Sequence, residues 1–247
     1  MKHPFWITTS WDDGHLLDLR VADCLEQHGL TGTFYICRDY LTERLSESQI
    51  AQLATRHEIG AHTLTHPELT ELEPASARRE IVKSRLWLER VTGAPVTAFC
   101  YPKGRSNPAL RAMVREAGYT VARTVLQYQL HLGDDPYDIP TTLHIYPFPL
   151  EPSTGIRGRF EPLRRISPHL RHLRIPITSL RNWSAMATAL LKTASETGGV
   201  WHLWGHSWEI EKYGMWGALN HLLKAASKYQ QAKIVTNSEL VRAFAVR

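Results

Sequence analysis

Short apolar runs alternate with longer helical patterns along nearly the whole chain, and this alternation restricts the possible folds more than any other feature. Strands separated by helices pair in parallel, because each helix returns the chain to the same end of the sheet. About seven or eight such units suit a β/α barrel. We therefore predict an α/β fold with strands over residues 5–11, 32–36, 58–62, 96–101, 119–124, 142–146, 200–204 and 233–235.

Three of the expected helices end at a glycine, which can adopt the left-handed conformation that closes a helix. Asn107 can cap the start of one of them, and Asn237 can cap a final helix that runs to residue 244. The three helices with their glycines are residues 16–27 with Gly29, residues 75–90 with Gly93 and residues 108–117 with Gly118.

One proline-rich segment, about residues 150–181, interrupts the alternation. Proline blocks a long helix, so we interpret the segment as an insertion that covers one side of the functional site. Between residues 157 and 181 it holds seven arginines against Glu161 alone, and it is one source of the net charge of +5. Such a segment could meet an anionic substrate or a membrane surface, or be a solvated face. No nucleic-acid recognition motif accompanies it, so we expect no nucleic-acid partner.

The composition bounds the size and the setting of the fold. With 247 residues, 43% of them hydrophobic, the chain can form one large core, and we expect a single domain over residues 1–247. No stretch approaches the roughly 18 apolar residues of a membrane span, and the first residues lack a signal-peptide pattern, so we expect a cytoplasmic protein. Cys24, Cys37 and Cys100 are odd in number and widely spaced, which favours reduced thiols.

Two acids, Asp12 and Asp13, follow the first predicted strand. Two histidines, His62 and His66, lie at the end of the third predicted strand and just after it. Successive side chains of a strand point to opposite faces, so the acids come together only if the chain turns, which Gly14 permits. On a helical turn, the four-residue spacing of the histidines would place them on one face, about 5–6 Å apart at Cβ. One acid and two imidazoles can bind a divalent ion and leave positions open, while the other acid accepts a proton from water. The sequence therefore predicts a metal-dependent hydrolase.

These residues resemble two motifs of the polysaccharide deacetylase family, also known as the NodB-homology or carbohydrate esterase family 4 group. The run from Ser10 to Gly14 resembles its Thr/Ser-aromatic-Asp-Asp-Gly motif, and the run from His62 to Pro67 resembles its His-Ser/Thr-x-x-His-Pro motif. The resemblance implies a distorted (β/α)7 barrel and one divalent ion, zinc before cobalt, nickel or manganese. It also implies roles for four residues: Asp12 as the general base, and Asp13, His62 and His66 as the metal ligands.

The family's third motif, Arg-x-Pro-x-Gly, is met by the run from Cys100 to Gly104, in which cysteine replaces arginine. By resemblance, the backbone N–H of Lys103 would stabilise the oxyanion, and Tyr101 is a candidate substrate contact. Arg123, at the end of a predicted strand, could replace the missing arginine by pairing with Asp12 and keeping that acid ionised. A purely structural salt bridge is the alternative for Arg123.

Later parts of the chain match the family less completely. The fourth motif, of the type Asp-x-x-Asp-Trp, is not recognisable. The Leu-x-His motif resembles the run from Trp204 to His206, which makes His206 the expected general acid for the leaving nitrogen. Trp208 and Tyr146 are candidate contacts for a sugar ring, although aromatic residues in such a cluster also form cores.

The sequence therefore predicts hydrolysis of an amide, and most specifically removal of an N-acetyl group from an amino sugar or glycan precursor. One alternative keeps the same site but cleaves a linear or cyclic amide outside sugars, which the missing fourth motif favours. Another is a carbohydrate-binding protein without catalysis. The sequence makes no prediction of the oligomeric state.

Overall fold

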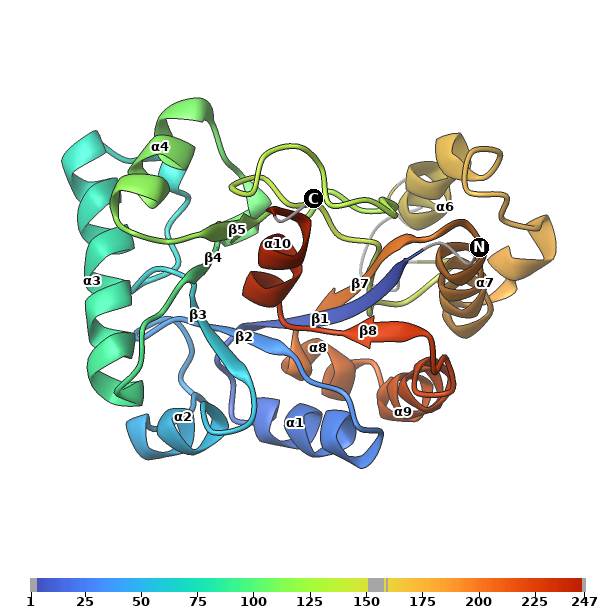
Figure 1. Ribbon diagram of the computed structural model, residues 1–247, viewed down its shortest axis with the longest axis horizontal. Coiled ribbons are helices and arrows are strands. Elements are labelled where there is room, and N and C mark those ends of the chain that lie inside the picture. The colour runs from blue at the N-terminus through green and yellow to red at the C-terminus, as the bar shows by residue number, and fades with distance from the viewer. Residues whose placement is uncertain (1–3, 151–157, 159, 246–247) are drawn as a thin grey trace.

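Eight parallel strands form one curled sheet in the computed structural model, which describes residues 4–150, 158 and 160–245 (Figure 1). Seven strands follow the order β5-β4-β3-β2-β1-β7-β6, and the eighth pairs with the first residues of β1. The predicted α/β fold of the distorted-barrel type is confirmed. The strands are β1 (Phe5–Asp13), β2 (Thr33–Ile36), β3 (Glu58–Ala61), β4 (Ala98–Cys100), β5 (Val121–Arg123), β6 (Leu143–His144), β7 (Gly199–Gly205) and β8 (Ala232–Ile234).

Helices connect these strands, and the four that the sequence predicts occur within two residues of their predicted bounds. Asn237 does not cap the last of them, because its side chain bonds to Thr8 and Tyr35. The hydroxyl of Thr236 accepts the N–H of Glu239 instead. Gly93, with φ of 68°, closes α3 (Pro74–Thr92), and the side chain of Asn107 accepts the N–H of Leu110 at the start of α4 (Pro108–Glu116). Among the described residues, no helix is long and apolar enough to cross a membrane. The other helices are α1 (Asp18–Gln27), α2 (Glu47–Leu53), α6 (Glu161–Ile166), α7 (Trp183–Thr197), α8 (Ser207–Lys212), α9 (Trp216–Ala226) and α10 (Asn237–Ala245).

The inner side of the sheet carries a column of polar side chains from β1, a strand whose nine residues are all buried. Side chains alternate along a strand, so every second residue of β1 faces this side. A buried polar group without a partner is costly, so each member of the column needs a partner from another element. The pairs are Thr8 with Asn237, Ser10 with His202, and Asp12 with Arg123. The column ends with an ion pair at the carboxyl end of the strand.

The proline-rich segment forms short helices, as its prolines predict. Its described part contains α6 and the 3-10 turns η3 (Ser167–His169) and η4 (Ile177–Arg181), and it lies beside α7 at one end of the molecule (Figure 1). Arg157 and Arg159 lie outside the described residues. Residues of α6 line a cavity together with His144 and Glu209, which agrees with an insertion that covers one side of the rim.

Candidate active site

Asp13, His62 and His66 converge on one point at the carboxyl ends of β1 and β3. The Nε2 atoms of both histidines lie 3.7 Å from Oδ1 of Asp13. Asp13 and His62 are each only 2% exposed, and Oδ1 of Asp13 has no hydrogen-bond partner among the described residues. A buried carboxylate oxygen that lacks a partner and faces two imidazole nitrogens fits a divalent cation. The three predicted ligands are therefore placed together.

A sharp turn after β1 brings the two acids side by side. Asp13 itself is left-handed, with φ of 83°, and Gly14 follows with φ of 74°. A Cβ atom on Gly14 would lie 2.7 Å from Cγ2 of Ile36, so this position also lacks room for a side chain. The turn that Gly14 predicts thus begins one residue earlier, on a non-glycine residue that bears backbone strain.

His62 and His66 lie close together, as the sequence predicts. They do not lie on a helical turn, so the predicted reason for their proximity is wrong. After β3 the chain forms an irregular loop, in which Thr63 and His66 have positive φ values of 67° and 57°. The rings of His62 and His66 meet edge to face, with centroids 4.7 Å apart. Left-handed residues, and not the helical period, set this arrangement.

Glu80 of α3 holds the histidine loop in place. Its Oε2 accepts the backbone N–H groups of Leu64 at 2.7 Å and Thr65 at 3.1 Å, and its Oε1 accepts the hydroxyl of Thr65 at 3.1 Å. The hydroxyl oxygen of Thr63 accepts the N–H of His66 at 3.0 Å. These bonds fix the backbone that carries both histidines.

Both histidines are held in the neutral form that binds a cation. Nδ1 of His62 lies 2.8 Å from the carbonyl oxygen of Cys100. Because a carbonyl only accepts, Nδ1 carries the proton and Nε2 keeps its lone pair. Burial lowers the pKa of His62, although Asp12 and Asp13 raise it. Burial and the nearby His62 lower the pKa of His66 to about 4.

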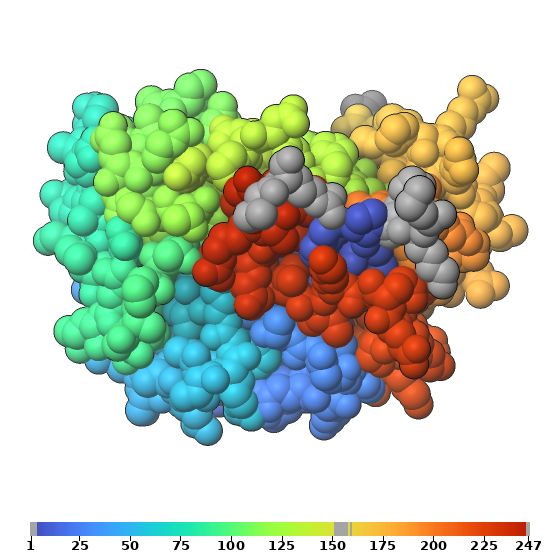
Figure 2. Space-filling view, in the orientation of Figure 1, coloured from blue at the N-terminus to red at the C-terminus, as the bar shows by residue number. Residues whose placement is uncertain are grey.

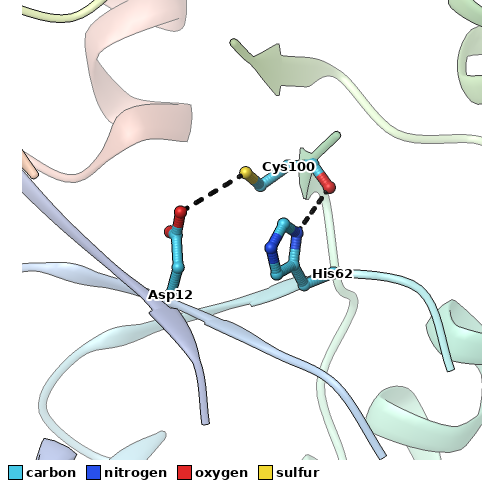
Figure 3. Close-up of side chains that lie close together, drawn as sticks. All are labelled: Asp12, His62 and Cys100. Carbon is cyan, nitrogen blue, oxygen red and sulfur yellow. Dashed lines mark hydrogen bonds between the residues drawn. The ribbon is translucent and has the colours of Figure 1, made fainter. Parts of the chain in front are cut away.

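Asp12 pairs with Arg123, as the sequence predicts for these two residues. Nη2 of Arg123 donates to both carboxylate oxygens of Asp12, and the arginine is 0% exposed. The Sγ atom of Cys100 lies 3.8 Å from Oδ2 of Asp12. Figure 3 shows that Cys100 contacts both Asp12 and His62, with its sulfur toward Asp12 and its carbonyl oxygen toward His62.

The surrounding charges keep Asp12 ionised. Burial alone would raise the pKa of Asp12, but the positive charges of Arg123 and His206 outweigh burial, and the pKa of Asp12 is lowered. Burial likewise opposes the charge of Arg123, yet Asp12 raises the pKa of the guanidinium. The buried pair is therefore a carboxylate and a guanidinium at neutral pH.

His206 is oriented by Glu209, a residue that the sequence analysis does not single out. Nδ1 of His206 lies 2.5 Å from Oε2 of Glu209, which also accepts Nε2 of His144 at 3.1 Å. The other nitrogen of His206, Nε2, faces Oδ2 of Asp13 at 3.8 Å. Burial would lower the pKa of His206, but Glu209 and Asp13 raise it to about 9. Burial raises the pKa of Glu209, but the two histidines lower it to about 2.

Trp208 contacts one of the predicted ligands directly. Its Nε1 donates to Oδ2 of Asp13 at 3.0 Å, and its ring lies 5.3 Å from the ring of His206. The indole therefore fixes one oxygen of Asp13 and leaves the other facing the two histidines. A contact between Trp208 and substrate stays a prediction.

Lys103 lies in a tight turn after β4, within the 3-10 turn η2 (Pro102–Gly104). Its φ of 56° and ψ of 11° are left-handed. Gly104 is left-handed too, and a Cβ atom there would lie 2.6 Å from the backbone nitrogen of Val125. The Lys103 side chain turns to Glu68, with Nζ 3.1 Å from Oε2. The geometry favours a role for the backbone of Lys103 over its amine, and the oxyanion role stays a prediction.

Tyr101 does not face the convergence point, in contrast to the substrate contact expected of it. It is 0% exposed, and its hydroxyl donates to the carbonyl oxygen of Tyr137 at 3.1 Å. The strand places its neighbour Cys100 on the inner side, so Tyr101 points to the opposite side, into the core. Its position at the rim is right, but its side chain is turned away from the site.

Tyr146 lies beside the site and not in it. It lines a cavity of about 240 Å³ together with His144 and Glu209. Its hydroxyl lies 3.1 Å from that of Tyr213, and its ring stacks on His144 with centroids 5.3 Å apart. A ligand in this cavity could reach Tyr146, so the predicted substrate contact remains a proposal.

Two carboxylates that the sequence analysis misses complete the site. Glu209 stands three residues after His206 at the start of α8, and this spacing could have identified it. Glu80 gives no comparable signal, because its bonds to the histidine loop join residues 15 and 16 positions apart.

Comparisons with known proteins agree with this geometry. Residues 2–122 match the model of the polysaccharide deacetylase family, which confirms the resemblance of the motifs. A chitooligosaccharide deacetylase from Rhizobium leguminosarum bv. phaseoli is 30% identical over 39% of this chain and 54% of its own length. The chain thus spans about half the length of this curated relative.

Two solved structures share the fold over nearly the whole chain. A protein from Mycobacterium smegmatis described as a polysaccharide deacetylase has a TM-score of 0.69 at 16% identity, covering 100% of this chain and 96% of that one. A family 4 acetyl xylan esterase from Clostridium thermocellum has a TM-score of 0.58 at 18% identity, covering 98% and 93%. At these identities the likeness shows the fold alone.

Proposed function

Since this chain matches the polysaccharide deacetylase family over residues 2–122, we propose that it is a metal-dependent amide hydrolase that removes the N-acetyl group from an amino sugar or glycan precursor. The main support is that a deprotonated carboxylate and a protonated imidazole lie beside the same buried cluster of Asp13, His62 and His66. Arg123 keeps Asp12 ionised, and Glu209 keeps His206 protonated. Amide hydrolysis needs both, because water must lose a proton and the leaving nitrogen must gain one.

Asp13, His62 and His66 would hold the cation. The buried Oδ1 of Asp13 and the two Nε2 atoms suit zinc, and also cobalt, nickel or manganese. When bound, a divalent cation supplies a Lewis acid beside the substrate carbonyl and lowers the pKa of water. Trp208 and Glu80 would hold the ligands in position through Asp13 and the histidine loop.

Asp12 would take the proton from the attacking water. A carboxylate of lowered pKa is a weak base, so the water must itself be acidic, which agrees with a cation site next to Asp12. Arg123 donates to Asp12 through a single nitrogen, and each carboxylate oxygen has a second lone pair for the water.

His206 would deliver a proton to the leaving nitrogen from Nε2. Its Nδ1 is bound to Glu209, so the proton that can be transferred lies on the atom that faces Asp13 and the site. The backbone N–H of Lys103 would stabilise the oxyanion that forms after attack. An amine leaves poorly as an anion, so the protonated imidazole assists the step in which the carbon–nitrogen bond breaks.

The sugar substrate is supported by the relative of the matched region, which is named a chitooligosaccharide deacetylase. Trp208 offers an aromatic face beside His206, and sugar rings pack on such faces. We therefore propose an N-acetylated amino sugar whose ring lies against Trp208.

A second candidate is an amide outside sugars, linear or cyclic. It is favoured by the contacts of Asp135 and Asp138, two acids near the place where the fourth motif would be expected. Both pair with Arg111, at 3.2 and 3.3 Å, so these carboxylates serve the fold and not a sugar groove.

Release of acetate from small N-acetylated amino sugars tests the proposal. The metal-loaded protein is compared with Asp12→Asn and with a chelator-treated sample, beside a panel of linear and cyclic amides. We expect acetate only with both metal and Asp12, and about one equivalent of metal retained in Asp12→Asn. Hydrolysis of another amide alone would select the second candidate. Bound metal with no hydrolysis at all would contradict both candidates and point to carbohydrate binding without catalysis.

A further inference from the structure

One end of the molecule carries positive charge that its own acids do not neutralise. On α6, Arg164 and Arg165 both pair with Glu161. Further along the same segment, three exposed arginines have no acidic partner within ion-pairing distance among the described residues. They are Arg171, Arg174 and Arg181.

A groove runs along α7 next to these arginines. It has a volume of about 650 Å³, and Arg174, Arg181, Lys192 and His221 are among its lining residues. The acid Glu196 also lines it, but it pairs with Lys192 of the same helix. The groove therefore keeps an excess of positive charge from its two arginines.

An apolar hollow of about 480 Å³ adjoins this groove, since Arg174 and Pro176 line both. Leu170, Ile175 and Ile177 also line the hollow. Ile177 is 79% exposed, the largest exposed fraction of any large apolar side chain in the described part of the chain. Ile175, two residues earlier, is buried at 5% exposure, so the segment is anchored while Ile177 projects.

Figure 2 shows the segment from α6 to η4 as a gold lobe at one end of the molecule, opposite α3. We use the term amphiphilic surface for Arg171, Arg174, Arg181 and Ile177 on this lobe. We propose that the amphiphilic surface docks onto an anionic lipid bilayer, with the arginines at the lipid phosphates and Ile177 among the headgroups.

The combination of charge and apolar exposure selects this occupant. A soluble polyanion would bind through the arginines alone, and a neutral apolar partner would bind through the apolar hollow alone. An anionic bilayer presents both a negative surface and an apolar layer beneath it, which matches cations that adjoin an exposed isoleucine. The surface uses none of the residues proposed for hydrolysis, so the inference does not depend on that activity.

Flotation with lipid vesicles tests the docking. We expect the full chain to float with vesicles of phosphatidylglycerol and phosphatidylcholine in equal parts, not with phosphatidylcholine alone, and to be released by high salt. Each basic residue near an anionic surface contributes about fivefold to binding, so replacing Arg171, Arg174 and Arg181 by glutamine should weaken binding about a hundredfold. Ile177→Asn, which adds no charge, should weaken it about tenfold, through loss of apolar contact.

Helix α3, at the other end of the molecule, offers matched controls. Replacing Arg78, Arg79 and Arg90 by glutamine removes the same charge, and Leu86→Asn alters a leucine that is 59% exposed. These variants should bind vesicles as the unaltered chain does, and circular dichroism with thermal melting verifies that all variants fold. The proposal is overturned if the unaltered chain ignores anionic vesicles, or if the α3 variants lose as much binding. Binding that soluble dextran sulfate displaces and that Ile177→Asn leaves unchanged would assign the surface to a polyanion instead.

Discussion

The Sγ atom of Cys100 lies 3.0 Å from Nη2 of Arg123, and these two residues are register partners on the neighbouring strands β4 and β5. Both side chains meet Asp12. Cysteine is small, so it leaves the space that the guanidinium from the next strand occupies. The motif that this chain resembles has arginine at the position of Cys100. Here the cation beside Asp12 comes from one strand further along the sheet.

Exchanging the two residues tests this arrangement. Arg123→Ala leaves Asp12 buried without its cation, so we expect a loss of about 3–5 kcal/mol in the free energy of unfolding and at least a ~100-fold loss in kcat/KM. The double variant with Cys100→Arg and Arg123→Cys returns the guanidinium to β4 and should regain most of both. Urea denaturation and acetate release measure the two effects. A double variant no better than Arg123→Ala would show that the side chain at 100 cannot supply the charge.

The pH dependence of turnover should move with Arg123. Arg123 lowers the pKa of Asp12, so its removal raises that pKa, and the base then becomes protonated at a higher pH. In Arg123→Met, the acidic limb of the kcat/KM profile is expected to shift to higher pH. Arg105→Met, which alters an exposed arginine paired with Glu68, is the control and should leave the limb in place. An unshifted limb in Arg123→Met would remove Asp12 from the role of base.

The pair of His206 and Glu209 predicts a pH-dependent stability of the metal-free protein. The pKa of His206 is raised from its ordinary 6.5 to about 9, so its protonation contributes stability that is fully present below 6.5 and is lost as the pH rises through about 9. Glu209→Gln removes the main partner and should flatten the fall in Tm between these values. Calorimetric scans across this pH range measure it. The same slope in both proteins would contradict the pairing.

Glu80→Gln should weaken metal binding without touching a ligand. The carboxylate of Glu80 accepts two backbone N–H groups of the histidine loop, and loss of such support commonly costs about 10–100-fold in metal affinity. Competition with a chelating dye measures the change in Kd for zinc. Glu73→Gln, at an exposed position before α3, removes the same charge and should not alter Kd. Equal affinity in the two variants would mean that the loop holds its shape without Glu80.

The strands were predictable because each is a short run of apolar residues bounded by turn signals. All eight occur where the sequence predicts them, and Gly93 and Asn107 fix helix ends through local backbone and capping bonds. Helices α2, α7, α8 and α9 lie outside the predicted ranges, although the capping box of Ser46 and Gln49 at the start of α2 is a local signal. Local patterns therefore carry most of this fold.

The cluster of Asp13, His62 and His66 was predictable from its motifs, but the contacts that hold it together were not. The spacing of His62 and His66 suggested a helix, whereas left-handed residues bring their rings together. The bond from Trp208 to Asp13 joins residues 195 positions apart and has no trace in the local sequence. Such partners depend on which strands become neighbours, which is a property of the whole sheet.

Thr63 and Lys103 each hold a positive φ without being glycine, as do Asp13 and His66. A left-handed conformation costs a residue with a side chain about 1–2 kcal/mol relative to its relaxed state. Directed evolution toward heat resistance would therefore be expected to select glycine at 103, where the exposed lysine side chain makes one surface ion pair, and not at 63, where the buried threonine hydroxyl accepts the N–H of His66. Glycine at 103 would also loosen the turn that positions the backbone amide of that residue. A gain in melting temperature at 103 should accordingly be accompanied by slower turnover, which makes this position a poor choice for engineering a robust catalyst.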